Sequence, residues 1–88
     1  MKMAIFCVHD RATQVFGTPM FLLSKGQAIR SFSDEVNRAA EDNQLYRHPD
    51  DFDLYELGDW ETETGEFFPH APVVLVRGKD VQNKLLES

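Results

Sequence analysis

The stretch HPDDFDLYELGDWETETGEF, residues 48–67, decides how the rest of the chain is interpreted. Pro49 suits the first position of a short helical turn, whose N-terminal end would interact favourably with the aspartates that follow. Phe52 to Trp60 then alternates in the way that is typical of a strand. Thr62 to Gly65 supplies a turn, and Glu66 to Phe68 is expected to return antiparallel. The stretch therefore predicts a β-hairpin.

The same stretch carries the charge of the chain. Eight carboxylates and no Lys or Arg lie between Asp50 and Glu66, whereas the formal net charge of the whole chain is -6. A solvated strand surface is the simplest interpretation, because exposed charge deters aggregation at a sheet edge. The alternation predicts two faces: Phe52, Leu54, Gly58 and Trp60 on one, and Tyr55 and Leu57 on the other.

Size and composition limit the possibilities. A chain of 88 residues with 42% hydrophobic residues is expected to fold as one domain, residues 1–88. The single cysteine, Cys7, excludes an intrachain disulfide and a cysteine-rich zinc site. No apolar run approaches the roughly 18 residues that span a bilayer. We therefore expect a protein of the cytoplasm, with no membrane partner.

The segments before the hairpin predict a strand, a loop and a helix. Lys2 to His9 is apolar on both sides of its alternation, as in a central strand. Asp10 to Ser24 is expected to be a long loop whose second half, Met20 to Leu23, pairs as a strand. Ser24 to Asp42 is the best helix, with a capping-box spacing from Ser24 to Gln27. Its apolar stripe consists of Ala28, Ile29, Phe32, Val36, Ala39 and Ala40, and Arg30 and Asp34 are spaced for an ion pair.

The segments after the hairpin complete an α+β fold. Pro69 and Pro72 are expected to end the strand ladder, so the return strand is short or lies at an edge. Val73 to Arg77 suits a last strand, and Lys79 to Glu87 allows a short C-terminal helix through Val81, Leu85 and Leu86. The order predicts one main helix packed on a small, mainly antiparallel sheet. The opposite sheet face would be partly apolar, with Tyr55, Leu57, Phe67 and Val74 on it, and available to a second copy.

No residue pattern points to catalysis. His9, His48 and His70 lack any helical metal spacing, and the acidic stretch does not match a calcium loop. Cys7 is expected to be a buried core residue rather than a nucleophile. We therefore expect no enzyme, no metal site and no cofactor.

Exposed aromatic residues are the remaining candidates for function. Rings such as Phe16, Phe21, Tyr55, Trp60 and Phe68 suit stacking on single-stranded bases if basic residues follow the phosphates. The negative net charge argues against broad nucleic-acid binding, although nine basic and seven acidic residues lie outside the acidic stretch. The alternative is that these rings form the core or a dimer interface. The expected phosphate contacts are Lys25, Arg30, Arg38 and Arg47.

Two segments, AIRSFSDEVN (residues 28–37) and the stretch 48–67, resemble the two best-marked segments of a known family. This family is the small non-structural protein of gokushoviruses, which are single-stranded DNA phages of the microvirus family. The resemblance covers about residues 3 to 69. It rests on Ala28, Ile29, Arg30, Phe32 and Asp34, and on His48, Pro49, Asp50, Asp51, Phe52, Leu54, Gly58, Thr64 and Gly65.

The resemblance implies a DNA-binding regulator of single-stranded genome synthesis or packaging, which acts in the infected bacterial cell. The partly apolar sheet face leads us to expect a homodimer. The acidic hairpin leaves a second hypothesis open. In that hypothesis the chain is a protein-interaction module that contacts a phage replication or capsid protein and does not touch DNA. Its partner-binding residues would be Asp51, Asp53, Glu56, Tyr55 and Trp60.

Overall fold

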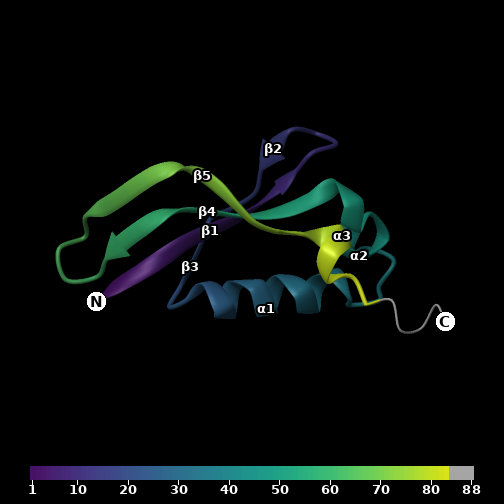
Figure 1. The fold of residues 1–88 in the computed structure, drawn as a ribbon, viewed down its shortest axis with the longest axis horizontal. Helices are drawn as coiled ribbons and strands as arrows, with labels where there is room; N and C mark the ends of the chain where they lie inside the picture. The colour runs from purple at the N-terminus through teal and green to yellow at the C-terminus, as the bar shows by residue number, and fades with distance from the viewer. Residues whose placement is uncertain (84–88) are drawn as a thin grey trace.

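The computed structural model describes residues 1–83 of the chain. A sheet of five strands has the order β2-β1-β4-β5, with β3 pairing β1 off this path, and every pairing is antiparallel. Helix α1 lies along one face of this sheet (Figure 1). The elements are β1 (Lys2–Asp10), β2 (Val15–Phe16), β3 (Met20–Leu22), α1 (Lys25–Val36), α2 (Gln44–Arg47), η1 (Pro49–Asp51), β4 (Phe52–Glu61), β5 (Phe67–Arg77) and α3 (Gly78–Val81). The predicted α+β class is confirmed.

Strand β1 is the centre of the sheet, as its apolar sequence predicts. It pairs with β4 from Lys2 opposite Glu61 to Asp10 opposite Phe52. On its other side it pairs with β3, which confirms the predicted strand, and with β2. Strand β2 was not predicted, because two residues are too few to show alternation.

Helix α1 begins at the predicted capping box. The backbone N–H of Gln27 donates to Ser24 Oγ at 3.2 Å, and the Gln27 side-chain oxygen accepts from the Leu23 N–H at 3.1 Å. The apolar stripe of the helix then packs on the sheet. The buried core that results contains Phe6, Ala28, Phe32, Val36 and Leu54.

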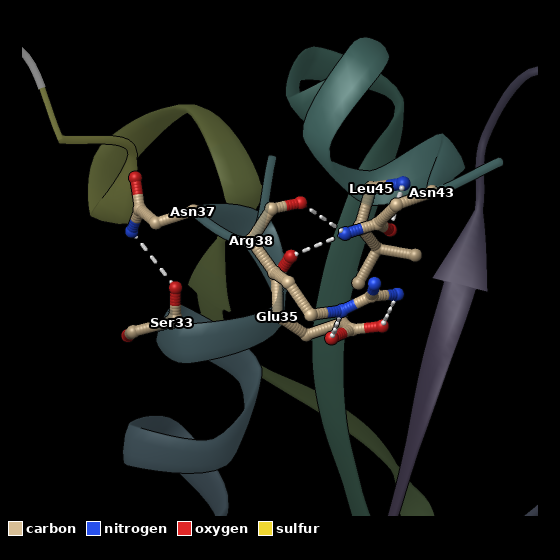
Figure 2. A network of polar contacts seen from close by, with 6 residues as sticks. All are labelled: Ser33, Glu35, Asn37, Arg38, Asn43 and Leu45. Carbon is tan, nitrogen blue, oxygen red and sulfur yellow. Dashed lines mark hydrogen bonds and ion pairs between the residues drawn. The ribbon is translucent and has the colours of Figure 1, made fainter. Parts of the chain in front are cut away.

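The predicted end of this helix at Asp42 is wrong, because α1 ends at Val36. The side-chain amides of two asparagines donate hydrogen bonds to backbone carbonyl groups in the last turns of α1 (Figure 2). The amide of Asn37 donates to Ser33 O at 2.8 Å, and that of Asn43 donates to Glu35 O at 2.8 Å. Asn43 also donates to Arg38 O at 2.9 Å and is 4% exposed. At Glu35 the Asn43 amide takes the place that the Ala39 backbone N–H would have in a longer helix, whereas Ser33 O accepts the Asn37 backbone N–H as well, at 3.2 Å. Ala39 and Ala40 lie outside the helix.

The prolines do not end the ladder, contrary to the prediction. Strand β5 runs from Phe67 to Arg77 through both Pro69 and Pro72, and it absorbs the predicted strand at Val73 to Arg77. It is an edge strand, in agreement with the second part of that prediction. A proline is tolerated at an edge because its missing N–H can face away from the neighbouring strand. The register with β4 also shifts beside these prolines, between Glu56 and Gly58.

An irregularity at Leu57 overturns the predicted faces of β4. Phe6 is opposite Glu56 whereas Ile5 is opposite Gly58, so Leu57 is an extra residue in the pairing with β1. A bulged residue shifts the alternation that follows it by one position. Gly58 and Trp60 consequently share a face with Tyr55, and not with Phe52 and Leu54.

The helical segments near the end of the described chain differ partly from expectation. The helical turn at Pro49 is confirmed as η1, and α2 was missed. A short C-terminal helix is present, but it covers Gly78–Val81, and the predicted Leu85 and Leu86 lie outside the described residues. Arg30 and Asp34 form no ion pair in the described part of the chain, where Arg38 pairs with Glu35 instead. Among residues 1–83, no helix is long and apolar enough to cross a bilayer.

Candidate functional site

The sheet face opposite α1 is the candidate site. Residues directly opposite each other in antiparallel strands place their side chains on the same face. On β1, Met3, Ile5, Cys7 and His9 alternate with the core residue Phe6, so they point away from α1. We call this surface the aromatic face. Its register partners are Phe16, Phe21, Asp53, Tyr55, Gly58 and Trp60, and through β4 also Phe67, Pro69, Val74 and Arg77.

Two groups of rings lie on this face. The first ring cluster is His9, Phe16 and Tyr55, with centroid separations of 4.3 Å from His9 to Phe16 and 5.3 Å from Phe16 to Tyr55. The second ring cluster is Phe21, Trp60 and Phe67, with 5.4 Å from Phe21 to Trp60 and 6.4 Å from Trp60 to Phe67. The contacts are tilted or edge-to-face, as expected for attractive ring pairs.

The rings shield the sheet but remain open to solvent themselves. Ile5 and Cys7 are 6% and 0% exposed although no described helix covers this face. In contrast, Phe16 is 44%, Phe21 38% and Phe67 59% exposed. Burial raises the pKa of the Cys7 thiol, which fits the predicted core role and not that of a nucleophile. The predicted apolar residues Tyr55, Phe67 and Val74 do lie on this face, whereas Leu57 is the bulged residue.

The acidic side chains of β4 lie mainly on the other face. Glu56 is opposite Phe6, Asp59 is opposite Ala4, and Glu61 is opposite Lys2. Since Phe6 and Ala4 pack toward α1, these three carboxylates point to the helix side of the hairpin. Among the described strand residues in register, Asp53 is the one acid on the aromatic face. The bulge at Leu57 therefore separates the rings from the acidic residues.

Asp53 belongs to a row of four residues in register across the sheet. Phe16 on β2 is opposite His9, His9 is opposite Asp53, and Asp53 is opposite Arg77 on β5. Asp53 is 1% exposed, and its Oδ2 lies 3.3 Å from Arg11 Nε. Arg11 also donates to the carbonyl of Asp50. The solvated surface expected for the acidic residues is therefore wrong at Asp53.

The four expected phosphate contacts do not form one patch. Lys25 and Arg30 are five residues apart on α1, or about 140° around its axis, and both are exposed. Arg38 follows the helix and forms two hydrogen bonds to Glu35, of 2.7 and 2.9 Å, which lower the pKa of Glu35 (Figure 2). Arg47 ends α2 and donates to the Glu41 carbonyl at 3.4 Å.

The expected partner-binding residues also do not lie on one surface. Asp51 lies in η1, Glu56 lies on the helix side of β4, and Asp53 is buried. Tyr55 and Trp60 belong to the two ring clusters of the aromatic face. His9, Arg11 and Phe67 were not among the predicted site residues. The alternation of His9 with the apolar residues of β1 was a usable signal for the first of them.

Two contacts raise the pKa of His70 from its ordinary value. Its Nδ1–H donates to the Ala71 carbonyl oxygen at 2.8 Å, its Nε2 lies 3.2 Å from Glu56 Oε1, and these contacts raise the pKa of His70. Both contacts favour the charged imidazolium, so their stabilising contribution is complete below the pKa of an unfolded histidine and is lost as pH rises through the folded value. Proton NMR titration should show His70 deprotonating at a higher pH than a free histidine side chain. A Glu56→Gln variant should reduce that difference but not abolish it, and an unchanged His70 titration in this variant would contradict the contact.

No group of three or more His, Cys, Asp or Glu side chains in residues 1–83 could hold a metal ion. The arrangement on the aromatic face instead suits a flat, polar ligand that stacks. Exposed rings bind bases through their π faces, and Arg77 lies at the edge of the same surface without an ion pair in the described chain.

The chain is similar in sequence to known phage proteins. The sequence model of the family described as "Phage ORF5 protein" matches residues 3–81. Protein ORF5 of Chlamydia phage 1 is 34% identical over 71 residues, which are 78% of this chain and 74% of the relative. No solved structure matches the chain. The match over nearly the whole described chain shows that this protein belongs to the phage ORF5 protein family.

Proposed function

We propose that this phage protein binds single-stranded DNA through the aromatic face and thereby regulates single-stranded genome synthesis or packaging in the infected cell. The observation that carries the proposal is the separation of rings from acids across β4. Glu56, Asp59 and Glu61 point to the helix side, so a strand of DNA on the rings does not pass over them. The negative net charge therefore weakens binding through long-range repulsion, which salt screens.

The rings supply most of the affinity in this proposal. Base stacking on an aromatic side chain contributes about 1–3 kcal/mol per base. Phe16, Phe21 and Phe67 are the most accessible rings of the two clusters. Arg77 is the phosphate contact on this face, because Arg11 already neutralises its register neighbour Asp53. Lys25 and Arg30 remain phosphate contacts for DNA that continues around the molecule.

Fluorescence of the single tryptophan, Trp60, provides a direct test. Titration with a 12-nucleotide oligo-dT at about 50 mM salt should quench this fluorescence as bases stack beside Trp60. A Phe21→Ala, Phe67→Ala double variant should bind about 30-fold or more weakly, which corresponds to two stacked rings at the lower end of the range. Phe68→Ala is the matched control, because Phe68 is 43% exposed on the same strand but is opposite Asp59 on the other face.

Two results would contradict the proposal. One is the absence of binding by the native protein at this low salt concentration. The other is an equal loss of affinity in the double variant and in Phe68→Ala, since this would show that the rings act through general stability and not through contact. Circular dichroism of each variant separates these cases by measuring the folded fraction.

A second copy of the chain competes for the same surface. Exposed rings on an uncovered sheet face are typical of an interface, and the homodimer expected from the sequence would place the two aromatic faces together. If the homodimer forms through the aromatic faces, oligo-dT should dissociate it into monomers. Sedimentation velocity with and without the oligonucleotide measures this competition, and a dimer that binds DNA without dissociating would place the dimer contact elsewhere.

The helix-side acids favour the protein-interaction hypothesis as a second candidate function. Glu56, Asp59 and Glu61 lie on one face of the hairpin, which extends beyond the N-terminal end of α1 (Figure 1). This face would suit a basic segment of a replication or capsid protein. Retention of such a phage protein, lost in an Asp59→Asn, Glu61→Gln variant but kept in Phe67→Ala, would support this candidate over DNA binding.

A further inference from the structure

The two ring clusters of the aromatic face contain ring pairs of nearly the same geometry. In the first ring cluster, Phe16 and Tyr55 lie edge-to-face with their centroids 5.3 Å apart and an interplanar angle of 75°. In the second ring cluster, Phe21 and Trp60 lie edge-to-face at 5.4 Å and 67°. In each pair the phenylalanine comes from a strand on one side of β1, and its partner comes from β4 on the other side. The face therefore presents the same arrangement of rings twice.

The register on β1 sets the distance between these two ring pairs. Both rings of the first pair are displaced by four residues of β1 from their counterparts in the second. The register partners on β1 are His9 for Phe16, Ile5 for Phe21, Cys7 for Tyr55 and Met3 for Trp60. Four residues of a strand span about 13 Å, because a strand rises about 3.3 Å per residue. The two ring pairs are thus related by a shift of about 13 Å along β1.

The surface between the two ring pairs offers no ring for stacking. Cys7 and Ile5 are 0% and 6% exposed, and Gly58, which is opposite Ile5 on β4, has no side chain. Within residues 1–83, no ring of the first cluster contacts a ring of the second. A ligand that stacks on both clusters must therefore cross a short stretch where it stacks on nothing.

The charge on this face suits a phosphate backbone that follows β1. Arg77 is exposed and lies in the same row across the sheet as His9, with Asp53 between them. The Asp53 carboxylate is buried and paired with Arg11, so it does not repel a phosphate as a free carboxylate would. Arg77 is therefore available to a phosphate beside the first ring cluster.

We infer that the aromatic face holds two nucleotide subsites, one on each ring cluster, which bind bases two positions apart on a DNA strand that runs along β1. The inference rests on the proposed function. One strand of duplex DNA rises roughly 3.4 Å per nucleotide, and a strand whose bases stack on a protein extends to about twice that rise, because its backbone straightens. Two such steps span about 13 Å, which matches the shift between the ring pairs. The intermediate base lies over Cys7 and Gly58 and stacks on no ring.

Two oligonucleotides with the same base content and the same charge test this spacing. Both have 12 nucleotides, half of them thymidines and half abasic (X), in the orders d(TX)6 and d(TTXX)3. Thymines lie two positions apart throughout d(TX)6, whereas no two thymines of d(TTXX)3 are two positions apart. Titration of the native protein at about 50 mM salt, followed by Trp60 fluorescence, should show d(TX)6 binding about tenfold more tightly, as expected for one additional stacked base. The affinity of d(TX)6 should be close to that of oligo-dT, because the intermediate base contributes little.

A Phe16→Ala variant should lose this preference. It removes the most exposed ring of the first cluster, so both oligonucleotides fill the remaining subsite equally well. Trp60 belongs to the second cluster and still reports binding there. Val15→Ala is the matched control, because Val15 is also on β2 and 58% exposed but is opposite Asp10, whose side chain is not on the aromatic face. This control should keep the tenfold preference, and circular dichroism confirms that both variants are folded.

The outcomes separate the spacing from the function on which it rests. Tight binding of oligo-dT together with equal or stronger binding of d(TTXX)3 would overturn the two-position spacing and leave the stacking surface intact. A preference that persists in Phe16→Ala would overturn the first ring cluster as a subsite. Absence of oligo-dT binding would overturn both the inference and the proposed function. The comparison of the two patterned oligonucleotides uses the native protein, so it does not depend on the folding of a variant.

Discussion

Replacing Gly58 by alanine is expected to lower the free energy of unfolding by about 4 kcal/mol. Gly58 has φ +146°, a region that side-chain-bearing residues rarely adopt. A Cβ there would also lie 2.4 Å from the Phe68 carbonyl oxygen and 2.7 Å from Pro69 Cα. Both obstacles are backbone atoms of β5, which cannot move without breaking the pairing with β4.

Gly65→Ala is the matched control for this prediction. Gly65 also has a positive φ, of +77°, but no described atom lies within 4 Å of the position that an added methyl group would take. Its substitution should cost only the strain of the left-handed conformation, about 1 kcal/mol. Urea unfolding followed by circular dichroism measures both variants, and equal losses would show that the close approach of β5 to Gly58 does not restrict the site.

The prediction for Gly58 also bears on function, because Gly58 adjoins the bulged Leu57. The two residues change which side chains of β4 point away from α1. Before the bulge, Leu54 faces the helix and Tyr55 the rings; after it, Trp60 joins the rings and Asp59 faces the helix side. If Leu57 were paired in regular alternation instead of bulged, Trp60 would point to the helix side and Asp59 would lie on the aromatic face. The separation of aromatic and acidic residues thus depends on a local backbone feature.

The sequence predicts the layers of this fold well, because they follow from local patterns. The capping box of Ser24 and Gln27 and the apolar spacing of Ala28, Phe32 and Val36 determine where α1 begins and which side it buries. The uninterrupted apolar character of β1 likewise indicates a central strand. These signals need no information about distant residues.

The prediction errors arise where residues distant in the sequence determine the local structure. The helix stops at Val36 because the amide of Asn43, eight residues after Glu35, takes the Glu35 carbonyl, and helix periodicity contains no sign of this. Pro69 and Pro72 suggest a strand end, whereas an edge position tolerates both. The faces of β4 were wrong after Leu57, since a bulge depends on the partner strand. The candidate site has the same limit: the sequence correctly placed Tyr55 and Phe67 on one face, but it put Trp60 on the other.

Replacing Phe6 by alanine is expected to lower the free energy of unfolding by about 4 kcal/mol through a different mechanism. Phe6 is 0% exposed and packs with Phe32 and Leu54 between β1, β4 and α1. Truncation removes its apolar contacts and leaves a cavity that the rigid sheet cannot close. Phe68→Ala serves again as control, because a ring that is 43% exposed should contribute less than about 1 kcal/mol.

The Phe6→Ala variant also separates stability from binding. Phe6 alternates with Ile5 and Cys7 on β1, so its side chain lies on the α1 side and does not touch the aromatic face. At low temperature the folded fraction of the variant should therefore bind oligo-dT with native affinity. Its Trp60 fluorescence should be half quenched at the same oligo-dT concentration as that of the native protein. A folded Phe6→Ala variant with weakened DNA affinity would show that the two faces of the sheet do not act independently. An unchanged unfolding midpoint would instead contradict the place of Phe6 at the centre of the core.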